Sequence, residues 1–370
     1  MKQKKLSNSI PQDRMTNFDL LRIVSCIFII VIHVSFYIWS NHFKYWNFLN
    51  TFARPMLWVF MMLSGFFLLE KPVRSITRFY ITRISKVGIS LIVYTIICQT
   101  CFDIQNITSI SSFFNQISFT QMLTGQIPHG SPFWFIYSLI GLYILTPFLI
   151  ELFHNMSNKR FTYFLCVVMF FMLTTPILSS FFSIPLRTTI FIGNEVFFFY
   201  IFGYAIHRLK LYRFSKVIYL SALFFYPLSF IIRADKSITM DFDGASITMV
   251  ALCSFVFVIF YNMKFLNKSN GWIAKAVSYF GKSTFGIYMI HMFVIERMLS
   301  IPFFNISDGN YRYQVIFNVI VVFFVSFAIS QVVEFLIVNP LNRFVKFLIK
   351  LYDDKKVERT ENQTIKPAVE

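Results

Sequence analysis

Residues 18–39 decide the class of fold, and they read FDLLRIVSCIFIIVIHVSFYIW. A helix needs about 20 apolar residues to cross the hydrocarbon core of a bilayer, and this run is long enough. It also exceeds the apolar segment of about 7–15 residues in a secretory signal peptide, so we expect no signal cleavage. Because lipid offers no partners to backbone polar groups, such a run is expected to be helical.

The composition extends this interpretation to the whole chain. Of the 370 residues, 56% are hydrophobic and 14% are charged. A soluble domain has about a quarter of its residues charged, so a soluble globular class is excluded. The formal net charge of +17 does not indicate nucleic-acid binding, because no basic soluble segment is long enough to hold a recognition fold.

Ten apolar segments predict an all-α polytopic membrane protein with about ten transmembrane helices. Lys and Arg gather in the loops that an inside N-terminus places in the cytoplasm, which predicts that both termini are cytoplasmic. We expect a cytoplasmic segment over 1–17, a transmembrane domain over 18–338, and a basic amphipathic, then disordered, cytoplasmic tail over 339–370. The predicted spans are 18–39, 52–70, 84–102, 132–153, 161–180, 190–207, 214–233, 244–263, 278–300 and 313–338.

Two ionisable residues of the first predicted span share a face. Arg22 and His33 are separated by a helical rotation of about 1100°, which is three turns plus about 20°. The helical rise places them ~16 Å apart, with Arg22 near the inner interface and His33 toward the outside. Asp19 lies one turn before Arg22 and is expected to pair with it. A snorkelling arginine and a hydrogen-bonded core histidine would show the same spacing, so a structural role stays open.

Two further ionisable residues reach the predicted depth of His33. Glu195 lies near the outer end of the sixth predicted span, and His291 lies within the ninth. A charge at this depth costs several kcal/mol, about 2.5–3.5 on insertion scales, so each one needs a reason. We hypothesise that His33, Glu195 and His291 converge on one outward-facing polar pocket, where a carboxylate or a second imidazole would orient a general base.

Cations crowd the start of the third predicted span. Arg78, Arg83 and Lys86 form a group that can hold phosphates, although a role in topology alone would produce the same cluster. The sequence Cys98-x-x-Cys101 has no second Cys or His pair at metal-ligand spacing, so no metal site is expected.

Four segments, in order along the chain, carry a resemblance to a known family. They are Arg22 followed after ten residues by His33; the apolar run 58–66 that ends in Ser64-Gly65-Phe66; Phe133-Trp134-Phe135 with Leu145-Thr146-Pro147; and the stretch from Ser283 to Tyr288-x-x-His291. Together they resemble the acyltransferase-3 family of integral membrane acyltransferases, and the likeness covers most of the chain.

The chain departs from the family pattern at two places. The family often has a His two positions before the Trp-Phe pair, where this chain has Pro132, and the nearest candidate is His129. The family's Arg-x-x-Arg motif is present as Arg83-x-x-Lys86, and lysine keeps the charge but loses the planar guanidinium fork.

The resemblance implies a multi-pass enzyme of the plasma membrane that moves an acetyl group from cytosolic acetyl-CoA to a hydroxyl of a cell-surface polysaccharide or its lipid-linked precursor. It implies that His33 is the general base or a transient acetyl carrier. Glu195 or His291 would orient His33 or receive the proton. Arg22, paired with Asp19, would guide the donor. Arg78, Arg83 and Lys86 would hold the phosphates of acetyl-CoA, and His129, Trp134 and Tyr137 would contact the acceptor. The alternative is a polysaccharide exporter, flippase or assembly protein without acyl-transfer chemistry. The polar loop 103–131, which contains His129, would be an acceptor-binding loop or a linker.

Overall fold

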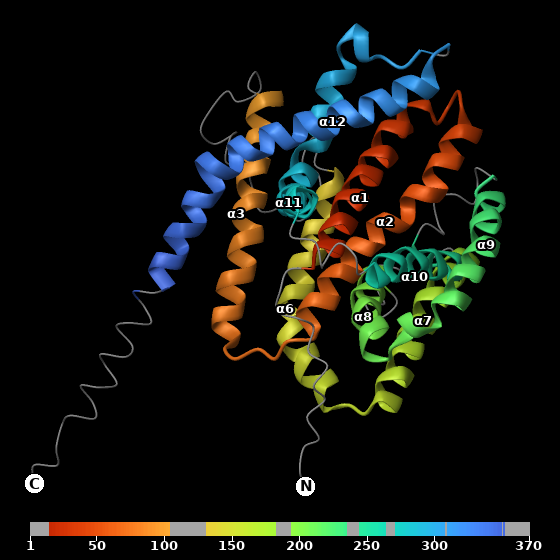
Figure 1. Ribbon diagram of the computed structural model, residues 1–370, viewed down its shortest axis with the longest axis vertical. Helices are drawn as coiled ribbons and strands as arrows, with labels where there is room; N and C mark the ends of the chain where they lie inside the picture. The colour runs from red at the N-terminus through yellow and green to blue at the C-terminus, as the bar shows by residue number, and fades with distance from the viewer. Residues whose placement is uncertain are drawn as a thin grey trace, which may run out of the picture. The chain divides into compact units, whose positions relative to one another are not determined.

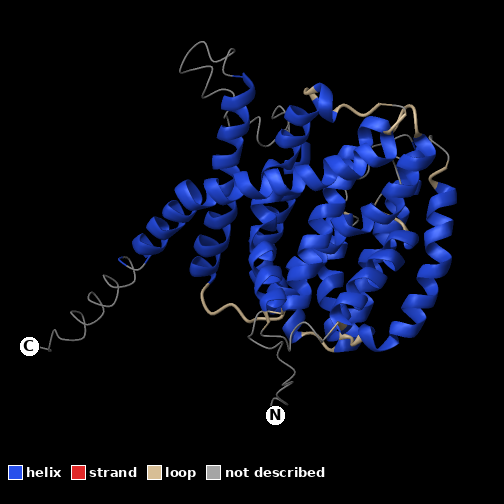
Figure 2. Cartoon of the chain, turned by 45° about the horizontal axis from the view of Figure 1, so that its top comes forward, coloured by secondary structure: helices blue, strands red, loops and turns tan. Residues whose placement is uncertain are grey.

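A computed structural model describes residues 15–103, 131–182, 194–234, 244–263, 271–307, 309–349 and 351 of the protein. Within these residues every regular element is helical (Figure 2). Six of the helices are long and apolar enough to cross a membrane. The predicted all-α class is therefore confirmed, whereas ten crossings and cytoplasmic termini stay predictions.

Each predicted span corresponds to a helix, although the ends are shifted (Figure 1). The helices are α1 (Thr16–Ser35), α2 (Phe43–Leu69), α3 (Ile76–Asp103), α6 (Trp134–Asn155), α7 (Asn158–Phe182), α8 (Glu195–Arg208), α9 (Ser215–Ile232), α10 (Ile247–Asn262), α11 (Trp272–Leu299) and α12 (Tyr311–Val333).

Three helices differ from the predicted spans in a way that matters for the site. Helix α2 begins at Phe43 rather than near residue 52, because polar residues of its first turns find partners, as when the Asn47 side chain donates to the Phe230 carbonyl. Helix α8 begins only at Glu195, where the side chain of Asn194 caps it by accepting from the Val196 amide. Helix α12 continues through a π-helical turn, Glu334–Val338, into helical residues 339–349, so the predicted start of the tail lies within a continuous helix.

The chain forms two compact units. One unit combines residues 1–74 and 144–327, and the other combines 75–143 and 328–370. In the second unit, α3 packs against the π-helical turn, where Lys86 acts electrostatically on Glu334. In the first unit, α1 contacts both α2 and α11 (Figure 1), and the functional candidates of the first predicted span lie along these contacts.

Glycines allow the helices of the first unit to touch backbone to backbone. A Cβ added at Gly65 of α2 would lie 1.7 Å from the Tyr200 carbonyl oxygen of α8, and one added at Gly203 of α8 would lie 2.0 Å from the Met62 carbonyl oxygen. Gly281 of α11 lies close to Asp19 of α1, since its added Cβ would lie 2.7 Å from the Asp19 Cβ and 3.1 Å from the Asp19 Cα. Small residues at interfaces are the usual means by which membrane helices approach closely, so these contacts hold α8 on α2 and α11 on α1.

The contacts also give the relative directions of the helices. Helix α11 runs in the same direction as α1, whereas α2 runs in the opposite direction. A chain that crosses a membrane at each predicted span requires these directions, because the first and ninth spans point outward and the second points inward. The pairs that show the directions are Asp19–Gly281 and His33–His291 for α1 with α11, and Phe18–Phe66 and Ser35–Asn50 for α1 with α2.

Candidate active site

The structure brings together two histidines that lie far apart in the sequence. The ring centroids of His33 on α1 and His291 on α11 are 5.1 Å apart, with the ring planes tilted by 49°. His291 is buried, with 1% of its surface exposed, whereas His33 is partly exposed. We call these two residues the histidine pair. His33 is thus the more exposed residue of the pair and the better candidate to meet a substrate.

The hydrogen bond of His291 sets its tautomer. Its Nδ1 lies 2.6 Å from the Tyr288 carbonyl oxygen, and a carbonyl can only accept, so Nδ1 carries the proton. In the described part of the chain, the buried Nε2 atom has no hydrogen-bond partner. A neutral imidazole held in this tautomer keeps a lone pair on Nε2, and this lone pair can accept a proton or a hydrogen bond from a bound group.

Arg54 of α2 is a third member of the site that the sequence analysis did not identify. Arg54 and His291 both act electrostatically on His33. The Arg54 Nε donates to Asn50 Oδ1 at 3.2 Å, and Asn50 Nδ2 donates to Ser35 Oγ at 3.0 Å. The available signal was a charged residue within the apolar segment 52–70, which the sequence analysis did not single out. The structure places it near the histidine pair.

Glu195 lies near the site but outside the histidine pair. Its Cγ and the ring of Trp58 both approach Gly244, where an added Cβ would lie 2.9 Å from the first and 2.4 Å from the second. Trp58 is one helical turn beyond Arg54 on α2, so Glu195 borders the same stretch of that helix. Among the described residues, Glu195 forms no hydrogen bond or ion pair with His33 or His291. The predicted three-residue convergence is therefore found for the two histidines, with Arg54 acting on His33 in place of the carboxylate.

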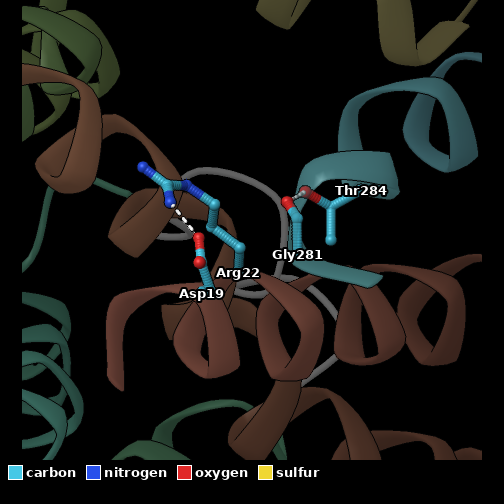
Figure 3. A network of polar contacts seen from close by, with 4 residues as sticks. All are labelled: Asp19, Arg22, Gly281 and Thr284. Carbon is cyan, nitrogen blue, oxygen red and sulfur yellow. Dashed lines mark hydrogen bonds and ion pairs between the residues drawn. The ribbon is translucent and has the colours of Figure 1, made fainter. Parts of the chain in front are cut away.

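Asp19 and Arg22 form the ion pair that their spacing predicts. Arg22 Nη1 donates to Asp19 Oδ1 at 2.7 Å, and Figure 3 shows this pair above α1. The Asp19 side chain is fully buried against Gly281, whereas 28% of the Arg22 side chain is exposed. The guanidinium carbon of Arg22 also lies 5.0 Å from the ring centroid of Phe67 on α2.

Arg22 and His33 lie on the same side of α1, as predicted. Both residues have a partner on α2, since Arg22 contacts Phe67 and His33 interacts with Arg54. The α11 side agrees, because Asp19 and His33 both lie against that helix. The shared face follows from the helical repeat, because eleven residues make three turns and only about 20° more.

The predicted phosphate-binding residues lie in the second unit. Arg78, Arg83 and Lys86 are exposed side chains on the first turns of α3, and Lys86 faces Glu334. Exposed guanidinium and ammonium groups can bind the oxygens of an anion, as Lys86 does electrostatically with the Glu334 carboxylate. No cluster of His, Cys, Asp or Glu that could hold a metal ion is found in the described residues.

The predicted acceptor-binding residues differ in their exposure, and one of them is not described. Trp134 begins α6 with 40% of its surface exposed. The Tyr137 hydroxyl, one turn further, is buried and has no hydrogen-bond partner within the described ranges. His129 lies outside the described residues.

Comparison with known proteins identifies the family. No curated protein and no solved structure matches the chain. A family model described as an acyltransferase domain matches residues 15–335, which include α1, the histidine pair, Arg54 and the cations of α3. Because this match covers most of the chain, the protein belongs to the acyltransferase-3 family and is an acyltransferase.

Proposed function

We propose that this acyltransferase moves an acetyl group from cytosolic acetyl-CoA to a hydroxyl of a cell-surface polysaccharide or its lipid-linked precursor, at the plasma membrane. The observation that carries the proposal is the histidine pair with Arg54 beside it. Two imidazoles in contact and a guanidinium within one helical bundle supply a proton acceptor and a positive charge, which are the groups that acyl transfer to a hydroxyl needs.

His33 acts as the general base in this proposal. Its imidazole accepts the proton of the sugar hydroxyl as the hydroxyl oxygen attacks the thioester carbonyl carbon. The carbon–sulfur bond then breaks, and the CoA thiolate takes the proton back from His33, so that an acetyl ester and free CoA result. His291 lies beside this ring, and its buried Nε2 lone pair can accept a hydrogen bond from the His33 ring.

The donor enters from the cytosolic side in the proposal. Arg78 and Arg83 supply guanidinium forks and Lys86 supplies a point charge for the phosphates of CoA. The partial exposure of Arg22 supports a role in guiding the donor, because its charge stays accessible although Asp19 pairs with it. Trp134 supports acceptor binding, because an exposed aromatic ring can stack on a sugar face.

A gene deletion with complementation tests the proposal. We expect NMR of the purified surface glycan to lose its O-acetyl signals on deletion and to regain them with the wild-type gene. His33→Ala should reach the membrane in normal amounts without restoring the signals. His42→Ala is the matched control, because His42 stacks on Tyr311 at 3.6 Å and lies outside the histidine pair.

Four results would overturn or revise parts of this proposal. Unchanged O-acetyl signals after deletion would exclude the proposed acceptor, and transport of the glycan without acetyl-CoA consumption would favour an exporter. Restoration of the signals by His33→Ala would remove His33 from the mechanism. Trapping of an acetyl group on His33 would replace direct transfer with a covalent intermediate.

A further inference from the structure

Arg54 is a permanent charge in an apolar helix, and its position needs a physical reason. It lies within Phe43–Leu69, a segment long and apolar enough to cross a membrane. A charged residue in such a segment costs about 2.5–3.5 kcal/mol on insertion scales. A role in setting topology does not require the guanidinium to lie close enough to act on His33, because a charge in the preceding loop has the same effect on orientation.

A chain of hydrogen bonds holds Arg54 in place from the neighbouring helix. Ser35 lies two residues after His33 on α1, and its Oγ accepts from Asn50 Nδ2. The second hydrogen of this amide goes to the Trp46 carbonyl at 3.1 Å, so the Asn50 side chain is fixed with its Oδ1 toward Arg54 Nε. Asn50 is buried, whereas Arg54 is partly exposed. The guanidinium is thus fixed at its Nε edge and accessible in part, as expected for a preorganised charge.

We propose that Arg54 is a catalytic residue whose guanidinium binds the thioester oxygen of the donor and stabilises the negative charge that develops there. This inference rests on the proposed function. When the hydroxyl oxygen bonds to the carbonyl carbon, its proton passes to His33 and the carbonyl π electrons move onto the oxygen that Arg54 contacts. When the carbon–sulfur bond breaks, these electrons return to the carbonyl and the thiolate takes the proton.

The assignment follows from the charges in the site. The histidine pair offers proton acceptors, but a neutral imidazole offers no permanent positive charge. Arg54 supplies a guanidinium, whose positive charge is permanent, and its hydrogen bond to Asn50 fixes it in place before the reaction. Preorganised donors of this kind contribute most where charge develops in the transition state, and the loss of one oxyanion donor costs about 10²–10³-fold in kcat.

Kinetics in isolated membranes test this role. Membranes that carry the native glycan are incubated with radiolabelled acetyl-CoA, and the incorporated label gives kcat and the KM for acetyl-CoA per folded protein. We expect Arg54→Gln to lower kcat by about 10²-fold or more with an unchanged KM, because the charge acts on the transition state. Arg54→Lys should retain part of the activity, and added guanidinium should partly restore Arg54→Ala. The control is Arg312→Gln, which replaces an exposed arginine at the start of α12. Its kcat and KM should equal those of the wild type.

The outcomes separate this inference from the proposed function. If wild-type membranes incorporate no label, the proposed function fails. If the wild type incorporates label, His33→Ala does not, and Arg54→Gln keeps the wild-type kcat, then the Arg54 role is wrong while the proposed function stands. A purely structural role would lower the melting temperature of Arg54→Ala without rescue by guanidinium, which also overturns the inference. If Arg54→Gln fails to fold, wild-type kcat in Arg54→Lys would overturn it in the same way, because lysine lacks the planar fork.

Discussion

Replacement of Gly65 by alanine tests whether backbone contact between α2 and α8 holds the first unit together. The added Cβ would lie 1.7 Å from the Tyr200 carbonyl oxygen, and real Cβ atoms essentially never come within 3.0 Å of another heavy atom. The helices must therefore separate locally by at least 1.3 Å, the difference between these two distances. The obstacle is backbone rather than the end of a flexible side chain, so no rotamer change can relieve it.

The expected loss of stability is at the upper end of the cost of overpacking. Inserting one methyl group into a close-packed contact typically costs about 1–3 kcal/mol. Alanine is a better helix former than glycine by about 1 kcal/mol, which offsets part of this cost. Gly203→Ala meets the Met62 carbonyl at 2.0 Å across the same contact, so one separation relieves both clashes. The double variant should therefore lose less stability than the sum of the single variants.

Thermal unfolding of the detergent-solubilised protein measures this effect. Gly65→Ala should lower the melting temperature, and Gly141→Ala in α6 is the matched control, because its added Cβ has nothing within 4 Å. The control should melt at the wild-type temperature or slightly above it. Equal melting temperatures for the two alanine variants would refute the close approach of α2 and α8.

Two predictions concern the ends of α2 and α8. Burial raises the pKa of the Glu70 carboxyl above its usual value, and the charge of Arg208 opposes this shift. The stability that this group contributes at low pH is therefore lost as the pH rises through its folded-state pKa. Glu70→Gln should therefore raise the melting temperature relative to the wild type at about pH 8 but not at about pH 4, and an equal effect at both would contradict this. Arg208 donates to the Phe153 and Met156 carbonyls at the end of α6, and Arg208→Ala should cost about 1.5–3 kcal/mol of unfolding free energy in chemical denaturation. The unfolding free energy of Arg208→Lys should lie between that of the alanine variant and that of the wild type, because one ammonium cannot reproduce the guanidinium fork. Wild-type stability in either variant would show that these hydrogen bonds are dispensable.

Local physics explains the features that were correctly predicted. The length of the apolar runs requires helices, because lipid gives backbone groups no other partners, and the described residues are helical accordingly. The ion pair between Asp19 and Arg22 follows from their spacing of three residues. The shared side of Arg22 and His33 follows from their spacing of eleven residues. The family resemblance is also local, since each of its motifs lies within a short stretch of the sequence.

Contacts between distant segments explain what the sequence analysis missed. It missed Arg54, because apolar runs mark where a helix is hydrophobic and not where it begins, and α2 begins at Phe43 rather than near residue 52. It joined Glu195 to the two histidines by depth alone, whereas Glu195 meets Trp58 and Gly244.

The amino-acid sequence contains enough to assign an all-helical membrane acyltransferase and to place Arg22 and His33 on one side of a helix. Helical periodicity and apolar length act within a segment, so neither depends on the rest of the chain. The meeting of His33 with His291 and the place of Arg54 depend on which helix faces pack together. That choice is made by contacts between helices, such as Asn50 on Ser35 between α2 and α1, and Gly281 on Asp19, whose partners are separated by most of the chain.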